Sequence, residues 1–303
     1  MTEISTPAPR PRRLLLGGLA AATVAGAAVA ALVVASSGGT AHTTRPLRSD
    51  RISLMAVSEV LGKASNAAAA GPDLHPKPGQ LLYFASTSTQ NGGPATPRKA
   101  WLSVDGRHPG LIDQSLNGQR MYVWICSDEQ GGSPNGTADL AHPPKNCHDQ
   151  PAYDPSVPTD PTAAKDWLYR NSKGSNPPDV QAFITVGDTI REHYLPARSL
   201  AALFKAAARI PGVKVYRNVV DSAGRPGIAV GQTWRYDRQE LIFDPTTYKL
   251  IGEREVCDTD DSFHPAGESK TDMPSAVPCK NGQVGYSSAE LGFGVVDRPG
   301  RLP

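Results

Sequence analysis

The sequence predicts the α+β fold class, with an N-terminal transmembrane helix followed by one domain in which helices pack on a curved antiparallel sheet. Three observations predict this arrangement. A long uncharged apolar run lies near the N-terminus, helical and strand-like segments are segregated along the chain, and short turns connect successive strand-like segments. With 303 residues, the chain is long enough to bury a substantial core.

An uncharged apolar run occupies positions 14–35. At about 1.5 Å of rise per residue, a helix over these positions spans the roughly 30 Å hydrocarbon core of a bilayer. Arg10, Arg12 and Arg13 precede the run and the residues just after it are uncharged, so its N-terminal side is expected to face the cytoplasm. The predicted order is a cytoplasmic tail (1–13), a transmembrane helix (14–36), a tether (37–48) and an extracytoplasmic α+β domain (49–303).

The same run also fits an export signal that is cleaved. It is longer than the usual signal core of about 7–15 apolar residues, but the small residues at 39–41 are typical of a cleavage site. Residues 12–16 also resemble a twin-arginine signal. Under either interpretation most of the chain leaves the cytoplasm, and a retained helix places the protein in the cell membrane with its C-terminal domain outside.

The charge balance argues against nucleic-acid binding. Lys and Arg total 31, Asp and Glu total 29, and positions 1–13 carry the whole net charge of +2. The predicted outer domain is therefore neutral, whereas a protein that binds a phosphate backbone needs a surplus of basic side chains on its folded part.

Four cysteines agree with an oxidising compartment. An even number in an exported chain predicts two disulfides, with three possible connectivities. Cys126 is nearly as far from Cys147 along the chain as Cys257 is from Cys279, and these short separations favour the two local pairs. The alternative of a four-thiolate zinc site lacks the usual C-x-x-C spacing.

The domain is predicted to begin with a helix over residues 51–70 and three strands, over 80–86, 98–104 and 119–126. Alternation along the strands places aliphatic side chains on one face and aromatic side chains on the other. Because both faces are apolar, either loops cover the aromatic face or that face is the wall of a pocket for a lipid-like ligand. The residues of this possible apolar ligand wall are Tyr83 (or its neighbour Phe84), Trp101, Tyr122 and Trp124.

Three helices and a second group of strands are predicted to follow. Turn residues separate the strand-like runs by only a few positions, which is typical of an antiparallel meander. The expected helices are 159–171, 179–195 and 198–210, and the expected strands are 213–221, 227–236, 240–244, 248–257 and a short last one at 293–296.

Five stretches carry a resemblance to a known family: AWLSVDG at 100–106, LAALFKAAARIPGV at 200–213, DSAGRPGIAV at 221–230, LIFDPTTYKLIGER at 241–254 and GVVDRPG at 294–300. In these stretches the chain resembles an uncharacterised family of actinobacterial single-pass membrane proteins, often encoded near extracytoplasmic-function sigma factors. The resemblance implies a cell-envelope protein and, as one possibility, an interaction partner in a sigma-factor signalling complex. Many members carry a longer cytoplasmic head than the short tail at positions 1–13 of this chain.

No motif for a catalytic nucleophile, a zinc protease or a phosphate-binding loop is found, and the seven histidines are scattered. We therefore expect no catalytic residue, no metal ligand and no cofactor. The sequence favours a non-enzymatic, membrane-anchored sensor or binding protein of the cell envelope, with a protein partner or a lipid-like ligand. An exported enzyme with an unrecognised site is the alternative.

Overall fold

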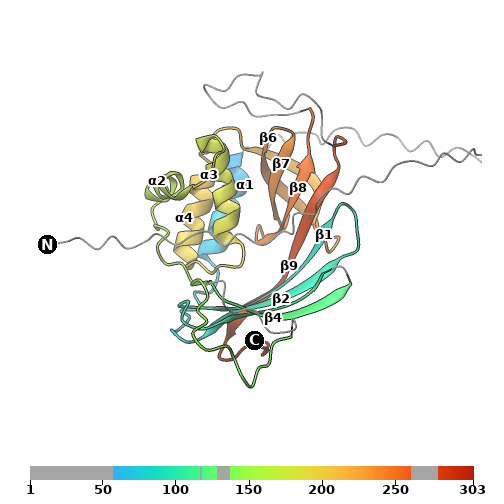
Figure 1. The fold of residues 1–303 in the computed structure, drawn as a ribbon. Coiled ribbons are helices and arrows are strands. Elements are labelled where there is room, and N and C mark those ends of the chain that lie inside the picture. Colours follow the sequence, from blue (N-terminus) through green and yellow to red (C-terminus); the bar gives the residue numbers. More distant parts are fainter. Residues whose placement is uncertain (1–56, 117, 128–136, 261–278) are drawn as a thin grey trace, which may run out of the picture. The chain divides into compact units, whose positions relative to one another are not determined.

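The computed structural model describes residues 57–116, 118–127, 137–260 and 279–303, which belong to one compact unit, Asp50–Pro303. Within these residues, nine strands form one antiparallel sheet and four helices pack on it, which confirms the predicted α+β class (Figure 1). The predicted transmembrane helix at 14–36 lies outside the described residues. Among the helices that are described, none has the length and apolarity needed to cross a membrane.

The strands lie in the order β4-β3-β2-β1-β9-β8-β7-β6-β5 across the sheet. The strands are β1 (Leu81–Gln90), β2 (Thr96–Ser103), β3 (Gly110–Leu116), β4 (Gln119–Ile125), β5 (Lys214–Val220), β6 (Pro226–Trp234), β7 (Asp237–Phe243), β8 (Leu250–Cys257) and β9 (Val284–Val296). The helices are α1 (Val57–Ala69), α2 (Pro161–Asn171), α3 (Pro178–Ile190) and α4 (Ala197–Ala207).

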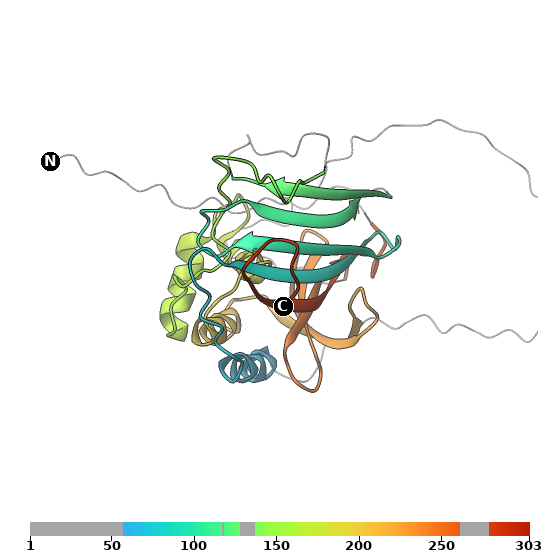
Figure 2. The same ribbon diagram turned by 90° about the horizontal axis from the view of Figure 1, so that it is seen from below.

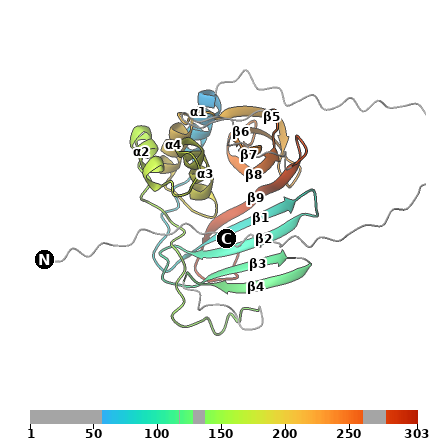
Figure 3. The ribbon, with the colours of Figure 1, turned by 45° about the horizontal axis from the view of Figure 1, so that its top comes forward.

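The sheet has two halves that meet at β9. Strands β1–β4 form one meander and β5–β8 form another, and β9 pairs with β1 on one side and with β8 on the other (Figure 3). The sequence predicts only a short strand at 293–296, whereas β9 has 13 residues, and β3 is not predicted at all. Both predictions fail because Gly, Ser and charged residues interrupt the alternation of apolar and polar positions in these strands.

The main core lies between the helices and the face of β5–β8 that they cover (Figure 1). Phe204 of α4 and Phe243 of β7 meet there edge to face, with their ring centroids 5.4 Å apart. Both rings are fully buried, together with Leu61 of α1, Leu168 of α2 and Leu203 of α4. Burial of these side chains stabilises the packing of helices on the sheet by about 1.5–3 kcal/mol for each one.

The opposite face of β5–β8 buries ion pairs. Glu240 of β7 is 2% exposed and accepts hydrogen bonds from Arg238, at 2.7 Å, and from Arg254 of β8. Arg238 also donates to Asp258, and its guanidinium lies 4.1 Å from the ring centroid of Tyr216. Two buried guanidinium groups thus share the Glu240 carboxylate, and Asp258 supplies the second negative charge.

The β5–β6 turn reaches the junction between β8 and β9. Within the turn, Arg225 donates from Nε to Asp221 at 2.6 Å. Its Nη2 donates to the carbonyls of Ile251 and Glu290, at 2.8 and 2.9 Å. Because these carbonyls belong to β8 and β9 beyond the end of their pairing, the guanidinium connects the two strands where the ladder does not.

Two disulfides have the pairing that the cysteine spacing favours. Cys126 and Cys147, with Cα atoms 5.1 Å apart, connect the end of β4 to the loop that follows it. Cys257 and Cys279, with Cα atoms 6.0 Å apart, connect the end of β8 to the segment just before β9. Each bond therefore fixes the end of a strand.

Replacing both Cys257 and Cys279 by Ser is expected to lower the free energy of unfolding by about 3 kcal/mol, because closing a loop of this length restricts the unfolded chain by about that amount. Urea unfolding followed by circular dichroism measures the change. The pair Cys126→Ser and Cys147→Ser should give a similar loss, since its sequence separation is 21 rather than 22. Variants as stable as the oxidised wild type would contradict the prediction.

Candidate functional site

The predicted aromatic wall is brought together in the structure. Tyr83 and Trp101 lie opposite each other on β1 and β2, with ring centroids 5.3 Å apart. Trp124 and the partly buried Tyr122 belong to the same cluster. Phe84 faces the other side of the sheet.

The chain itself covers this wall, which is the arrangement expected if loops occupy the aromatic face. Trp101 is 3% exposed, and its indole nitrogen donates to the carbonyl of Arg301 at 2.6 Å. Figure 2 shows the C-terminal segment in front of the β1–β2 side of the sheet. None of the four side chains lines the two hollows described next. A ligand would therefore have to displace the C-terminal segment to reach these rings.

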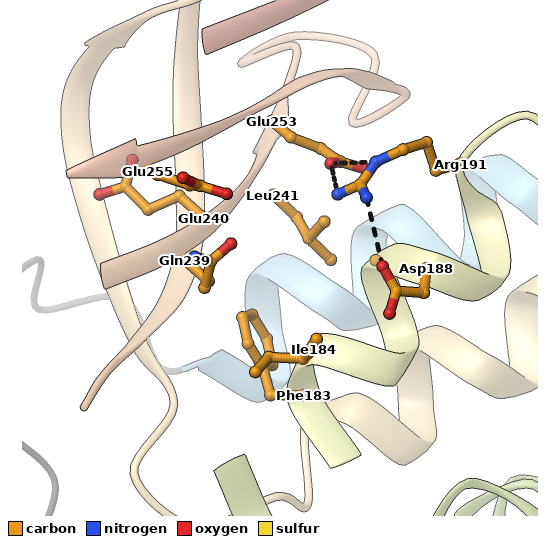
Figure 4. A pocket seen from close by; sticks show the side chains of 10 residues that line it. Phe183, Ile184, Asp188, Arg191, Gln239, Glu240, Leu241, Glu253 and Glu255 are labelled. Carbon is orange, nitrogen blue, oxygen red and sulfur yellow. Dashed lines mark hydrogen bonds and ion pairs between the residues drawn. The ribbon is translucent and has the colours of Figure 1, made fainter. Parts of the chain in front are cut away.

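Two adjoining hollows lie between α3 and the sheet, with volumes of about 160 and 120 Å³. The larger is bounded by α3 and strands β7 and β8, and the smaller extends toward β6. Both share Phe183 and Ile184 of α3 and Gln239 of β7, so they form one cleft along the helix, here called the α3 cleft. Figure 4 shows the residues that line the larger hollow. With Leu241, the two α3 side chains give the cleft an apolar floor.

An ion pair lies at the end of the cleft where α3 stops. The helix was predicted to continue to 195 but ends at Ile190, and the next residue, Arg191, caps it through its backbone N–H. The Arg191 side chain donates to Glu253 of β8 at 3.0 Å and to Asp188 at 3.2 Å (Figure 4). Glu253 is 7% exposed, and its backbone N–H donates to Ser288 Oγ of β9. The pair therefore connects the end of α3 to the sheet at β8.

Carboxylates outnumber guanidinium groups in this cleft. The charged residues among the described lining are one arginine, Arg191, and five acids: Asp188, Asp237, Glu253, Glu255 and Glu240, the last of which pairs with Arg238 and Arg254. Burial raises the pKa values of both Glu253 and Glu255. The negative charge of Asp237 raises the pKa of Glu255 further. The cleft therefore holds negative charge that its own cation does not neutralise.

Glu290 of β9 extends this negative surface. Burial raises its pKa to about 7, and the charges of Glu253 and Glu192 contribute, while Arg191 and Arg225 oppose the shift. Farther along β9, Phe293 lies on the same side of the sheet as Glu290. The register shift between Ala85 and Ser86 of β1 places one extra residue of β9 between Glu290 and Phe293, so these two side chains share a face.

Exposed aromatic surface lies beside these carboxylates. Phe293 is 42% exposed and packs on Phe84, at 5.1 Å between centroids, and on Tyr194, at 5.5 Å. Tyr194 in turn stacks on Tyr153 at 5.8 Å. The sheet face beyond α3 thus combines an exposed ring with acidic side chains.

Glu290→Gln is expected to make the protein more stable than wild type at pH 8, by about 1–2 kcal/mol, and to make little difference at pH 5. Glu290 keeps its proton longer when folded than when unfolded, so wild-type stability falls as pH rises from about 4.5 through 7. Partial exposure of the side chain reduces the effect below that of the full shift. Thermal unfolding at both pH values tests this, and an equal effect at both would contradict it.

A signal for this cleft is present in the sequence of β8, although it was not used to predict a site. Glu253, Arg254 and Glu255 are consecutive there, inside a strand of a predicted meander. Three consecutive charges place ionised groups on both faces of a strand, so one face must bury an ion pair or border a polar cleft. Here Arg254 is in the buried pair, and the two glutamates face α3.

No family model matches the chain, and no curated protein matches it. Among solved structures it is similar to MucB in complex with MucA(peri), with 13% identity and a TM-score of 0.28, over 81% of this chain and 57% of that chain. The Pseudomonas aeruginosa MucA/MucB complex gives 13% identity and a TM-score of 0.27, over 82% and 58%. A structure of MucB gives 12% and 0.27, over 82% and 60%. The chain thus covers less than two thirds of each of these chains, and its function has to be inferred from its own cleft.

Proposed function

We propose that this chain is a non-enzymatic binding protein of the cell envelope, anchored by a helix at 14–36, whose outer domain binds a protein partner in the α3 cleft. The observation that carries the proposal is the cleft itself, which has an apolar floor and is lined by more carboxylates than cations. Two disulfides support an oxidising compartment outside the cytoplasm. The family resemblance favours a sigma-factor signalling complex as the assembly to which the protein partner belongs.

The compartment is tested with alkaline phosphatase fused to the C-terminus, an enzyme that is active only where its own disulfides form. We expect activity in whole cells and, in mass spectra of the purified chain, a mass that includes residues 14–36 and does not increase on alkylation before reduction. A shorter mature chain would identify the run as a cleaved export signal and overturn the anchor. An inactive fusion together with four reactive thiols would overturn the whole proposal.

Partner binding is tested by blocking the cleft. Ile184 lines both hollows, so Ile184→Arg places a bulky charged side chain in the cleft. Thr246→Arg, in the exposed β7–β8 turn, is the matched control with the same change of charge. We expect the wild-type chain and the control to retain the same membrane proteins after cross-linking and purification, and Ile184→Arg to lose at least one of them while unfolding at a similar temperature. Identical retention by all three would contradict binding in this cleft.

A further inference from the structure

We infer that the occupant of the α3 cleft is an extended, basic segment of the partner protein, an inference that rests on the function proposed above. The segment has Lys or Arg side chains beside the carboxylates of β8 and β9, and an apolar side chain against Phe293. Charge, spacing and the exposed ring each support this assignment.

The first argument is charge complementarity. Glu253 is paired with Arg191, but burial first, and neighbouring carboxylates second, raise the energy of the ionised forms of Glu255 and Glu290. A cationic side chain entering the cleft lowers that energy, and it does so more effectively at partly buried sites than at an exposed surface. The outer domain as a whole is neutral, so this negative region is local.

The second argument is the spacing of the acidic groups. In the described residues, no three His, Cys, Asp or Glu side chains gather closely enough to hold a metal ion. The carboxylates are instead distributed along the cleft, with Glu253 and Glu255 two positions apart on one face of β8. Alternate side chains of an extended peptide have the same separation, about 6.6 Å, so its first and third residues match the two glutamates. Arg191 contacts Glu253 through Oε2.

The third argument is the length and the lining of the cleft. It follows α3, whose 13 residues span about 20 Å, which is enough for about six residues of extended peptide. Its floor is apolar at Phe183, Ile184 and Leu241, and the partly exposed ring of Phe293 lies beyond the acidic groups. A segment that alternates basic and apolar residues satisfies both kinds of surface, which a small polyamine does not.

The test uses the full-length chain in detergent micelles and a fluorescent hexapeptide, Lys-Leu-Lys-Ala-Lys-Leu with blocked ends. We expect saturable binding by fluorescence anisotropy, weakened about threefold or more between about 50 and 200 mM salt, since salt screens the attraction. The same peptide with Gln in place of Lys should bind at least about tenfold more weakly.

The contribution of the cleft is isolated by the double variant Glu255→Gln and Glu290→Gln. Its matched control is Glu59→Gln with Asp166→Asn, which makes the same change of net charge at exposed positions on α1 and α2. We expect the cleft variant to bind the basic peptide about tenfold more weakly than wild type, and the control to bind it like wild type. Equal loss in both variants would show non-specific attraction and would overturn the inference.

Applying the same double variant in the cross-linking experiment separates the two proposals. If Ile184→Arg loses the partner while Glu255→Gln with Glu290→Gln retains it, the cleft binds a partner whose segment is not basic, so this inference fails and the proposed function stands. If spermidine competes with the peptide at equal charge concentration, the site recognises charge alone, and the peptide assignment is overturned. If both variants lose the partner, both proposals are supported.

Discussion

Glu240→Ala is expected to lower the free energy of unfolding by about 3–5 kcal/mol, among the largest effects of any single substitution in this chain. The side chain is 2% exposed and is the shared acceptor of Arg238 and Arg254. Removing it leaves two guanidinium groups in a poorly solvated interior. Arg238 keeps Asp258 as a partner, whereas the structure gives Arg254 no other carboxylate as an ion-pair partner among the described residues.

Urea unfolding of the purified chain measures this loss, and Glu59→Ala is its control. Glu59 forms an ion pair with Lys63 one helical turn away, with about half of each side chain exposed, so its removal should change stability by less than about 0.5 kcal/mol. Glu240→Gln keeps the shape and some hydrogen bonds and should lie between the two. A loss below about 1 kcal/mol for Glu240→Ala would mean that the buried arginines find water or other partners.

Phe243→Ala is expected to lower the free energy of unfolding by about 3–5 kcal/mol through an empty space in the main core. The ring has no exposed surface and meets Phe204 edge to face, so the helices on one side and the sheet on the other would both lose contacts. The surrounding side chains come from the helices α1–α4 and from strands β5, β6 and β7, and such a core can collapse only partly around a missing ring.

Differential scanning calorimetry at one scan rate compares this variant with Phe293→Ala, its matched control on the exposed face. Phe293 is 42% exposed, so the same deletion should cost about 1 kcal/mol. The ratio of the two losses is the informative quantity. Similar losses would show that the core repacks around Phe243, contrary to its complete burial.

The fold class and the second meander could be predicted because their signals are local. Strands β5–β8 alternate strongly and are joined by turns of a few residues, and cysteine spacing alone favours the observed disulfides. The length of β9 could not be predicted in this way. Residues 284–292 include two glycines, two serines and a glutamate, which do not alternate as a strand would, and they form a strand because β1 and β8 pair with β9 on its two sides.

The α3 cleft required the three-dimensional arrangement. Glu255, which lines the cleft, and Glu290, on the neighbouring strand, are far apart in the sequence, and nothing in the chain order places them on one side of the sheet. For the aromatic wall, the sequence predicted which side chains share a face but not what covers them. Alternation correctly grouped Trp101 with Tyr122 and Trp124, but it carried no information about the C-terminal segment that covers them.

The contact between β8 and β9 has a consequence for how the domain can move. At one end of their short ladder the disulfide of Cys257 and Cys279 joins β8 to the segment just before β9, and at the other end hydrogen bonds from Arg225 and from the Glu253 backbone connect the two strands. Hydrogen bonds open reversibly at a small fraction of the energy that a covalent bond requires. The contact between β8 and β9 is therefore harder to open at its disulfide end than at the end near Glu290, where hydrogen bonds hold the strands.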